Sequence, residues 1–461
     1  MSDNINLDIV FTTDASENTA SINEDCIPDL SDDQLALDLG LAGFNTNARF
    51  VTGWGWVLWN GSCWQKDDNG RHIASIRHFL RATAKDYQDW ADKKIEAGSI
   101  KNEAVFRSSV ATTCKNLRSK RTVEAVEKLV RSNPQLVASP DQFDANPYLL
   151  GTPSGTVDLR TGDLREARGE DYITKQTAVT PAPKGDQPTV FLKFLDRVFD
   201  GDADLIALMR RAAGYALTGS TREHRLLFLY GTGRNGKSVY LNTFMGLLSD
   251  YSRRAPSSLF LDAKNESHPT GLAGLMGARL VVGSELPPGK TWNEPMIKDL
   301  TGGDVVTAHL MRQDFFDYLP QFTLMIAGNH QPSFRGIDEA IRARVCLVPF
   351  EVTIPEAERD PELENKLKAE WPEILRWAID GAMDWQQQGL NPPERVLLAS
   401  EEYLEGEDLF GRFLSEMTIE GKLDEISSRQ LFIAYQSWAE MNGLKPWTII
   451  AFGKAMTERG Y

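Results

Sequence analysis

The stretch GTGRNGKSVY at residues 231–240 constrains the fold more strongly than any other part of the chain. A glycine, four further residues and Gly-Lys-Ser reproduce the whole phosphate-loop pattern. A β-prone run at 226–230 enters it, and a helix-compatible segment at 239–248 leaves it. Backbone N–H groups of such a turn converge on phosphate oxygens, with the positive end of the next helix behind them. We therefore predict a nucleoside triphosphate site; the alternative is a chance glycine turn.

The predicted cofactors are ATP and Mg²⁺. Lys237 is expected to reach the β- and γ-phosphates, and the Ser238 hydroxyl is expected to ligate the metal. The predicted nucleotide-binding residues are Gly231, Thr232, Gly233, Arg234, Asn235, Gly236, Lys237, Ser238 and Val239.

Two further β-prone runs end in polar side chains suited to catalysis. Glu285 follows the run 279–282 and could hold Mg²⁺ through water and polarise the attacking water, although a surface carboxylate is the alternative. Asn329 follows the run 322–327, where an amide can orient the attacking water and report the presence of the γ-phosphate.

Two arginines, Arg342 and Arg344, lie just before a fourth β-prone run. They are far in sequence from residues 231–240, so we expect one of them to act on the nucleotide of a neighbouring subunit as an arginine finger. The other would be a surface arginine.

The segment 292–322 lies between the second and third of these runs and contains two β-like arms, 305–311 and 315–319. A hairpin here would project from the ATPase body and could meet the DNA backbone in a central pore. The predicted DNA-binding residues are Lys298, His309 and Arg312.

Composition indicates a soluble protein of about three domains. No apolar run approaches the ~20 residues of a membrane span, and no signal peptide follows Met1, so we expect no membrane partner. The four cysteines are scattered, without metal-ligand or disulfide-framework spacing, which favours a reducing cytosol. The six histidines show no ligand pairing either, so we expect no metal held by His and Cys. The net charge of −15 does not exclude a nucleic-acid partner, because ten acidic residues precede the first Lys or Arg, Arg49.

Residues 1–30 have the composition of a disordered acidic tail. A short helix is expected at 32–41 and a β-hairpin with an Asn-Gly turn at 49–70. The hairpin carries four tryptophans that could stack on bases, although a core role is favoured: Trp54, Trp56, Trp59 and Trp64.

Residues 71–134 are predicted to be helical. They carry a basic cluster that could touch phosphates, although a solvated helix face is favoured: Lys115, Arg118, Lys120 and Arg121. A strand–turn–strand pattern at 143–167 turns at 160–163 and is followed by a Pro-rich linker at 180–188. Amphipathic helices are expected at 189–222.

These motifs, taken in order, resemble those of a known family. The order GTGRNGKS, VVGSE, IKDLTGGD, IAGNHQP and DEAIRARVCLVPF is similar to that of superfamily 3 helicases of the phage/plasmid primase-helicase type, which includes the poxvirus primase-helicase. Upstream, FDANPYLLGTPSGTVDLRTGDL resembles the helicase-associated region of that family. Downstream, residues 431–461 are similar to its winged-helix module.

The resemblance implies an α/β fold with an AAA+-like P-loop ATPase core at 189–395. It further implies an α+β N-terminal helicase-associated domain at 31–188 and a winged-helix-like segment at 396–461. Because the chain stops at Tyr461, we expect the wing strands to be missing or the chain to be shortened.

The activity implied is that of a hexameric, ATP-driven replicative DNA helicase of a phage, prophage or plasmid, moving 3′→5′ on single-stranded DNA in the bacterial cytoplasm. Implied partners are fork DNA and a separate primase or origin-binding protein. By position, Glu285 is the acidic second motif, Lys298 and Gly303 belong to the hairpin motif, Asn329 is the sensor and Arg344 is the finger. Primase activity is not predicted, because neither a zinc-ribbon cysteine set nor a paired-acid motif is present.

Two departures from the family pattern affect these roles. Ser284 stands where a second acidic residue is common, so Glu285 would serve both metal and water. Ala343 separates two arginines that are often adjacent, which leaves open which of Arg342 and Arg344 is the finger.

Three other functions stay open as alternatives. An AAA+ switch that loads or remodels a protein partner shares every ATPase residue. A small-molecule kinase would need no trans-acting arginine, and a DNA-binding protein with an inactive ATPase would not need the complete set of motifs.

Overall fold

The computed structural model describes residues 27–262, 270–283, 286–309, 314–334, 337–419, 425–444, 446–458 and 461. It divides into two compact units: residues up to 158 with 164–176, and residues 159–163 with 177–461. Nearly all of the predicted acidic tail, 1–30, lies outside the described residues. The predicted domain boundaries, after residues 30, 188 and 395, stay predictions.

The first unit contains a four-stranded sheet in the order β3-β2-β1-β4. Its strands are β1 (Ala48–Val51), β2 (Gly55–Trp59), β3 (Trp64–Lys66) and β4 (Val137–Ala138). Neighbours are antiparallel except for the parallel pair β1 and β4. The predicted hairpin is thus confirmed, with Gly61 at φ 95° in the turn. Trp56 and Trp64 are only 5% and 1% exposed, which confirms a core role for these two side chains.

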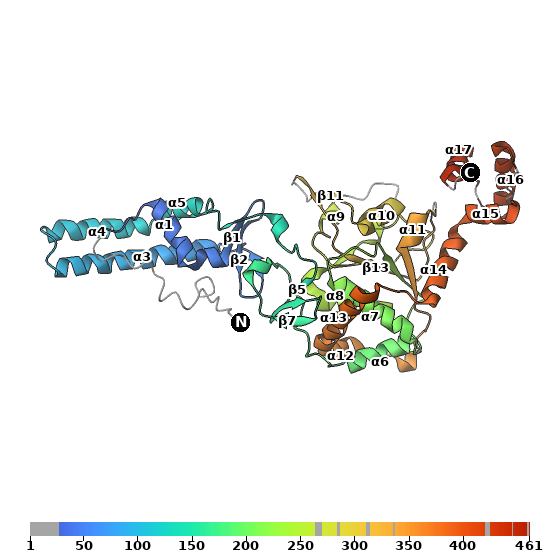
Figure 1. The fold of residues 1–461 in the computed structure, drawn as a ribbon, viewed down its shortest axis with the longest axis horizontal. Helices are drawn as coiled ribbons and strands as arrows, with labels where there is room; N and C mark the ends of the chain where they lie inside the picture. Colours follow the sequence, from blue (N-terminus) through green and yellow to red (C-terminus); the bar gives the residue numbers. More distant parts are fainter. Residues whose placement is uncertain are drawn as a thin grey trace. The chain divides into compact units, whose positions relative to one another are not determined.

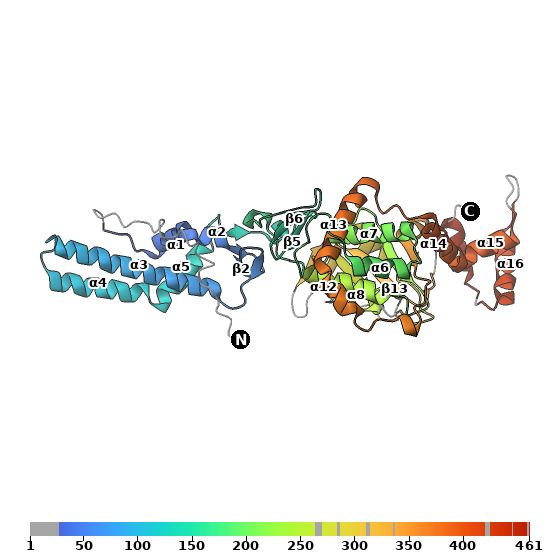
Figure 2. The ribbon, with the colours of Figure 1, turned by 90° about the horizontal axis from the view of Figure 1, so that it is seen from below.

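Helices make up most of the rest of this unit: α1 (Asp32–Leu39), α2 (Asn45–Asn47), α3 (Arg71–Glu96), α4 (Glu103–Leu117) and α5 (Lys120–Val130). Figures 1 and 2 show α3 and α4 as a long antiparallel pair, with α5 beside α3. Side chains of Ser31, Asn102 and Ser119 cap the starts of α1, α4 and α5 by accepting backbone N–H bonds. The predictions of a short helix at 32–41 and of a helical region at 71–134 are confirmed.

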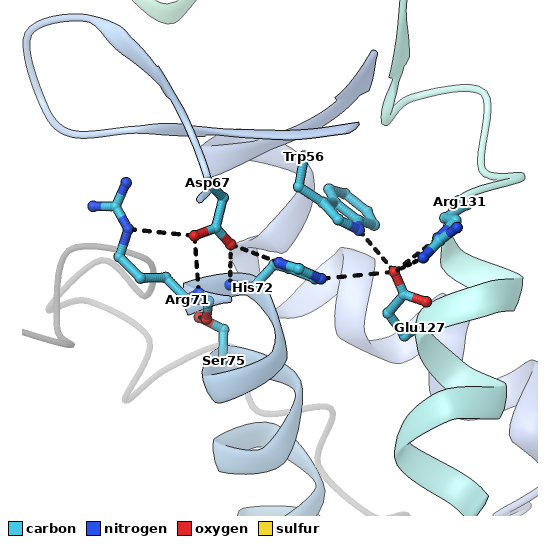
Figure 3. A network of polar contacts seen from close by, with 7 residues as sticks. All are labelled: Trp56, Asp67, Arg71, His72, Ser75, Glu127 and Arg131. Carbon is cyan, nitrogen blue, oxygen red and sulfur yellow. Dashed lines mark hydrogen bonds and ion pairs between the residues drawn. The ribbon is translucent and has the colours of Figure 1, made fainter. Parts of the chain in front are cut away.

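A polar network fixes α5 against α3 and the sheet (Figure 3). The His72 Nδ1 lies 2.6 Å from the Asp67 carboxylate, and its Nε2 lies 3.7 Å from Glu127 Oε1 on α5. Glu127 Oε1 also accepts bonds from Trp56 Nε1 at 2.8 Å and from Arg131 Nε at 2.7 Å. Because Asp67 and Glu127 are largely buried, these contacts order the three elements relative to one another.

The predicted strand–turn–strand pattern forms three short strands rather than two: β5 (Leu149–Thr152), β6 (Gly155–Asp158) and β7 (Asp163–Arg165). The expected turn at 160–163 joins β6 to β7. A second tight turn joins β5 to β6, where Gly155 has φ 146° and a Cβ would lie 2.1 Å from a backbone oxygen of Arg165. The missed turn explains the missed strand.

The second unit is built on a five-stranded parallel sheet in the order β14-β8-β13-β10-β9. Its strands are β8 (Leu226–Tyr230), β9 (Ser252–Ala255), β10 (Leu280–Gly283), β13 (Thr323–Gly328) and β14 (Val345–Pro349). Four of them were predicted and are confirmed. The fifth, β9, was missed because this edge strand carries two exposed arginines, Arg253 and Arg254, and lacks an apolar run.

Helices cover both faces of this sheet, as expected for buried parallel strands (Figure 1). One face carries α9 (Thr270–Ala273), α10 (Glu294–Gly302) and α11 (Glu339–Arg344). The other carries α6 (Thr189–Val198), α7 (Ala203–Leu217), α8 (Lys237–Leu248), α12 (Leu363–Ala369) and α13 (Trp371–Gln388). Alternate side chains of β8 point to the two faces of the sheet. On the first face, Phe228 packs against Trp292 and Tyr403. The fold is therefore mixed α/β with a parallel sheet, and the helices predicted at 189–222 are confirmed.

An antiparallel hairpin of β11 (Val306–His309) and β12 (Phe315–Tyr318) leaves this body between α10 and β13. The predicted arms are confirmed over the described residues, and the tip at 310–313 lies outside them.

The C-terminal part contains α14 (Glu394–Glu407), α15 (Leu409–Met417), α16 (Ser428–Met441) and α17 (Ile449–Glu458). Helices α15 to α17 share an aromatic core that includes Phe413, Tyr435, Trp438 and Phe452. Because the described residues after 409 contain helices and no strand, the winged helix stays a prediction. None of the helices in the described ranges is both long and apolar enough to cross a membrane.

Candidate functional site

The 231–236 loop connects the end of β8 to the start of α8 in a shape that depends on its glycines. Gly233 and Gly236 have φ angles of 106° and 85°, and Arg234 between them has φ 54°. A Cβ on Gly231 would lie 2.1 Å from the backbone oxygen of Phe350. The loop therefore turns sharply against the chain that follows β14, and it ends at the amino terminus of a helix.

Lys237, the first residue of α8, is buried inside this turn with only 5% of its surface exposed. Its Nζ donates to Gly231 O at 2.7 Å, to Asn235 Oδ1 at 2.9 Å and to Asn329 Oδ1 at 3.0 Å. These bonds use all three ammonium donors, and all three acceptors are neutral oxygens. Burial lowers the pKa of Lys237 to about 8. The site thus holds a partly desolvated positive charge that an anion would stabilise.

Asn235 connects this lysine to the neighbouring strand. It is 3% exposed; its Oδ1 accepts from Lys237, and its Nδ2 donates to Phe350 O at 2.7 Å. Sequence reasoning placed Asn235 among the nucleotide contacts but missed this link, because no local pattern points to a partner after β14.

Asn329 reaches the same lysine from β13, the strand beside β8. The parallel pairing sets Gly328 against Tyr230, and Gly231 N donates to Gly328 O at 3.3 Å. The carboxyl ends of β8 and β13 therefore converge, which brings Lys237, Asn235 and Asn329 together as the motif order predicts. Thr232 and Ser238 are exposed beside them.

Glu285, the predicted catalytic carboxylate and metal ligand, lies outside the described residues. The strand before it, β10, ends at Gly283 next to Ile326 of β13. Within the described ranges, no group of three His, Cys, Asp or Glu side chains could hold a metal ion.

Arg342 and Arg344 lie just before β14, beside the amino-terminal ends of the parallel strands, called here the amino edge of the sheet. Lys237 lies beside the carboxyl-terminal ends, called here the carboxyl edge. The register pairs Val345 with Leu226 at the start of the strands and Pro349 with Tyr230 at their end, and these two ends are roughly 13 Å apart along the strand. Arg344 donates to Thr301 Oγ1 at 3.2 Å and to Ala340 O at 2.9 Å. Arg342 pairs with Asp408 at 3.2 Å. The structure does not bring either arginine to Lys237 of the same chain.

Two of the three predicted DNA contacts, Lys298 and His309, lie on described elements. Lys298, on α10, pairs with Asp338 at 2.5 Å. Although burial would raise the pKa of Asp338, hydrogen bonds from Lys298 and from the Ile341 N–H lower it overall. His309 ends β11 opposite Phe315 in the hairpin, and Arg312 lies outside the described residues.

Comparison with known proteins gives two family matches. Residues 42–200 match the family described as D5 N terminal like, and residues 229–344 match a family of unknown function, DUF5906. Helicase-named viral proteins are similar to about two thirds of the chain. These relatives confirm the resemblance to proteins of the phage and viral primase-helicase type.

Three of these relatives are protein 184R of Invertebrate iridescent virus 6, protein L207/L206 of Acanthamoeba polyphaga mimivirus and protein 022R of Frog virus 3. They are 24%, 24% and 22% identical over 68%, 65% and 66% of this chain. The aligned region spans 37%, 34% and 40% of their own lengths.

Among solved structures, the apo C-terminal region of NrS-1 is similar at 12% identity, with a TM-score of 0.39 over 60% of this chain and 64% of that one. A second apo form, with a TM-score of 0.42, is 11% identical over 71% of this chain and 74% of that one.

Proposed function

We propose that this chain is the ATPase part of an ATP-dependent DNA helicase of a phage, prophage, plasmid or virus. The observation that carries the proposal is the buried Lys237, held by three neutral oxygens inside a glycine-rich strand-to-helix turn. Such a turn at the carboxyl edge of a parallel sheet suits the phosphates of a nucleotide.

The chemistry of the turn fits ATP with Mg²⁺. The backbone N–H groups of the loop and the amino end of α8 supply donors, and Lys237 supplies charge. The exposed Ser238 hydroxyl would ligate the metal, with Glu285 as the carboxylate beside it. The bound metal would neutralise negative charge on the phosphates.

The hydrogen bond between Lys237 and Asn329 would break when a nucleotide binds. When Lys237 turns its ammonium group toward phosphate oxygens, it releases the Asn329 amide, which lies 3.0 Å away. The freed Asn329 would then orient the attacking water. This gives Asn329 a physical means of reporting an occupied phosphate site.

The position of the arginines favours a ring of subunits. Arg342 and Arg344 lie beside the amino-terminal ends of the strands, and Lys237 lies beside their carboxyl-terminal ends. This placement suits a neighbour's nucleotide better than the nucleotide of the same chain. Arg344 is the better candidate for a neighbour's nucleotide, because Arg342 is ion-paired with the mostly buried Asp408. We infer a hexamer in which each amino edge faces the next subunit's carboxyl edge.

The proposed substrate is single-stranded DNA passing through the ring, gripped by the β11–β12 hairpin. Support comes from the helicase-named relatives and from the position of the hairpin between α10 and β13. A separate primase or origin-binding protein is the proposed partner, in the cytoplasm of a bacterial host or in an infected cell.

One observation favours a second candidate, an AAA+ switch that remodels a protein. The hairpin exposes apolar side chains at its base, where Val305 and Leu319 are 59% and 56% exposed, and beside its tip, where Phe315 is 66% exposed. Such a surface could grip a polypeptide in place of a DNA strand.

The test is ATP hydrolysis by the purified chain with and without single-stranded DNA, run beside a mass measurement of the assembly. The helicase proposal expects DNA-stimulated hydrolysis by a ring-sized species, followed by strand displacement. If a monomer hydrolyses ATP at the same rate with and without DNA, the result would favour a switch or a kinase.

A further inference from the structure

We propose that the first unit carries its own binding site for the phosphodiester backbone of a single DNA strand. The site is a pocket of about 660 Å³ between α3, α4 and the start of α5, called here the α4–α5 pocket. Its lining includes Gln88, Cys114, Lys115, Asn116, Arg118 and Ser119. It is separate from the proposed ATP site and needs no nucleotide.

The pocket is basic within an acidic protein. Residues 71–131 contain 14 Lys or Arg against 7 Asp or Glu, although the whole chain has a net charge of −15. Lys115 and Arg118 line the pocket, and Lys120 and Arg121 follow at the start of α5. All four side chains are exposed, so their charges face solvent.

Three of these four charges are available to a ligand. Lys120 pairs with Glu124 at 3.3 Å on the surface of α5. For Lys115, Arg118 and Arg121, the described residues offer no carboxylate as an ion-pair partner. Positive side chains that line a pocket without counter-charges suit an anion.

The uncharged lining adds donors in the same place. Gln88 and Asn116 carry amide N–H groups, and Ser119 is the N-cap of α5, a helix of 11 residues. The first N–H groups of a helix lack partners within the helix. Phosphate oxygens would thus meet both charge and hydrogen-bond donors.

The walls of the pocket are held in place. The Glu127 carboxylate ties α5 to His72 of α3 and to Trp56 of the sheet (Figure 3). Cys114 Sγ donates to Ala84 O at 3.3 Å and ties α4 to α3. A site on three mutually fixed helices is preorganised, so little ordering is needed when a strand binds.

A nucleic-acid strand fits the lining better than an acidic protein does. Protein interfaces depend on apolar or aromatic anchors in well-packed pockets. Here the apolar lining is limited to Ala111 and the buried Cys114. A strand needs closely spaced cations, and Lys115 and Arg118 lie one helical turn apart.

The test measures binding of a fluorescent oligothymidylate of about 20 nucleotides to the full chain without nucleotide. The pocket variant is Lys115→Gln with Arg118→Gln and Arg121→Gln. Its matched control removes three charges at the other end of the α3–α4 pair: Lys93→Gln with Lys94→Gln and Lys101→Gln. Thermal unfolding of both variants checks that the fold is kept.

We expect the pocket variant to bind at least about tenfold more weakly, and the slope of log K against log salt to fall by about 2 for three lost phosphate contacts. The control should stay within about twofold of the parent. Equal losses in both variants, or none in the pocket variant, would overturn the proposal.

Two competitors identify the ligand. Unlabelled oligothymidylate should displace the probe, whereas inorganic phosphate at matched ionic strength should not. Displacement by polyglutamate at equal charge would instead assign the pocket to an acidic protein, and displacement by phosphate would assign it to a free anion. A chain that fails to hydrolyse ATP but shows the pocket effect would contradict the proposed helicase and leave this inference standing.

Discussion

The carboxyl edge and the amino edge of the parallel sheet in the second unit differ in the partners of their positively charged side chains. At the carboxyl edge, Lys237, Asn235 and Asn329 meet within one chain, around a buried cation without a carboxylate among its hydrogen-bond partners. At the amino edge, Arg344 contacts neutral oxygens of its own chain and Arg342 an acidic partner. Under the proposed function, the first edge needs only a ligand to form a site, whereas the second would act on the nucleotide of a neighbouring subunit.

This contrast separates binding from turnover. In the proposed mechanism, charge and donors at the carboxyl edge would hold the phosphates, whereas an arginine at the amino edge would reach the phosphates of another chain. Variants at the two edges should therefore produce different defects.

The largest effect is expected from Lys237→Ala at the carboxyl edge. Hydrolysis should fall by at least ~10³-fold, because the charge that stabilises the transferred phosphoryl group is lost. ATP affinity should fall as well. Steady-state hydrolysis and nucleotide-binding assays measure the two effects, and Lys193→Ala, which changes an exposed lysine, is the control. Near-normal turnover in Lys237→Ala would show that this turn is not the catalytic site.

Arg344→Ala at the amino edge should reduce turnover by about 10³-fold and leave ATP affinity nearly unchanged. Arg342→Ala, the matched control, should mainly weaken the contact with Asp408 and change turnover only a few-fold. If Arg342→Ala gives the larger loss, the finger assignment is reversed, and if both variants turn over normally the amino edge has no catalytic role.

A moderate effect is expected from Asn235→Ala. Loss of the bonds to Lys237 and Phe350 should loosen the loop and weaken ATP binding by about tenfold, with a smaller change in turnover. Isothermal titration would measure this, beside the exposed Asn242→Ala on α8. An affinity like that of the control would mean that the loop holds its shape without Asn235.

The smallest effect is a pH dependence of ATP affinity. Since the pKa of Lys237 is about 8 before the anion binds, the lysine is mostly charged below pH 8 and loses its proton above it. Phosphate binding favours the charged form, so affinity should fall by about threefold from pH 7.5 to 8.5, with proton uptake on binding. Titrations in buffers of different ionisation enthalpy would detect the uptake; flat affinity without uptake would contradict this prediction.

Local patterns predicted four of the five strands of the sheet, because short continuous apolar runs such as LLFLY are typical of buried parallel strands. They also located the turn around Lys237, because glycine adopts the positive φ angles of Gly233 and Gly236 without steric cost. They failed at β9, whose strand conformation comes from pairing with β10 rather than from its own side chains. They also missed the bond from Asn235 to Phe350, because a contact over 115 positions depends on the sheet order.

The account rests on the claim that the two edges meet only between subunits. The most direct test mixes Lys237→Ala with Arg344→Ala subunits, each inactive alone, and measures hydrolysis. In a mixed ring, one subunit's intact lysine can lie beside its neighbour's intact arginine, so about a quarter of the interfaces should recover activity in an equal mixture. A mixture no more active than the two variants apart would contradict the claim.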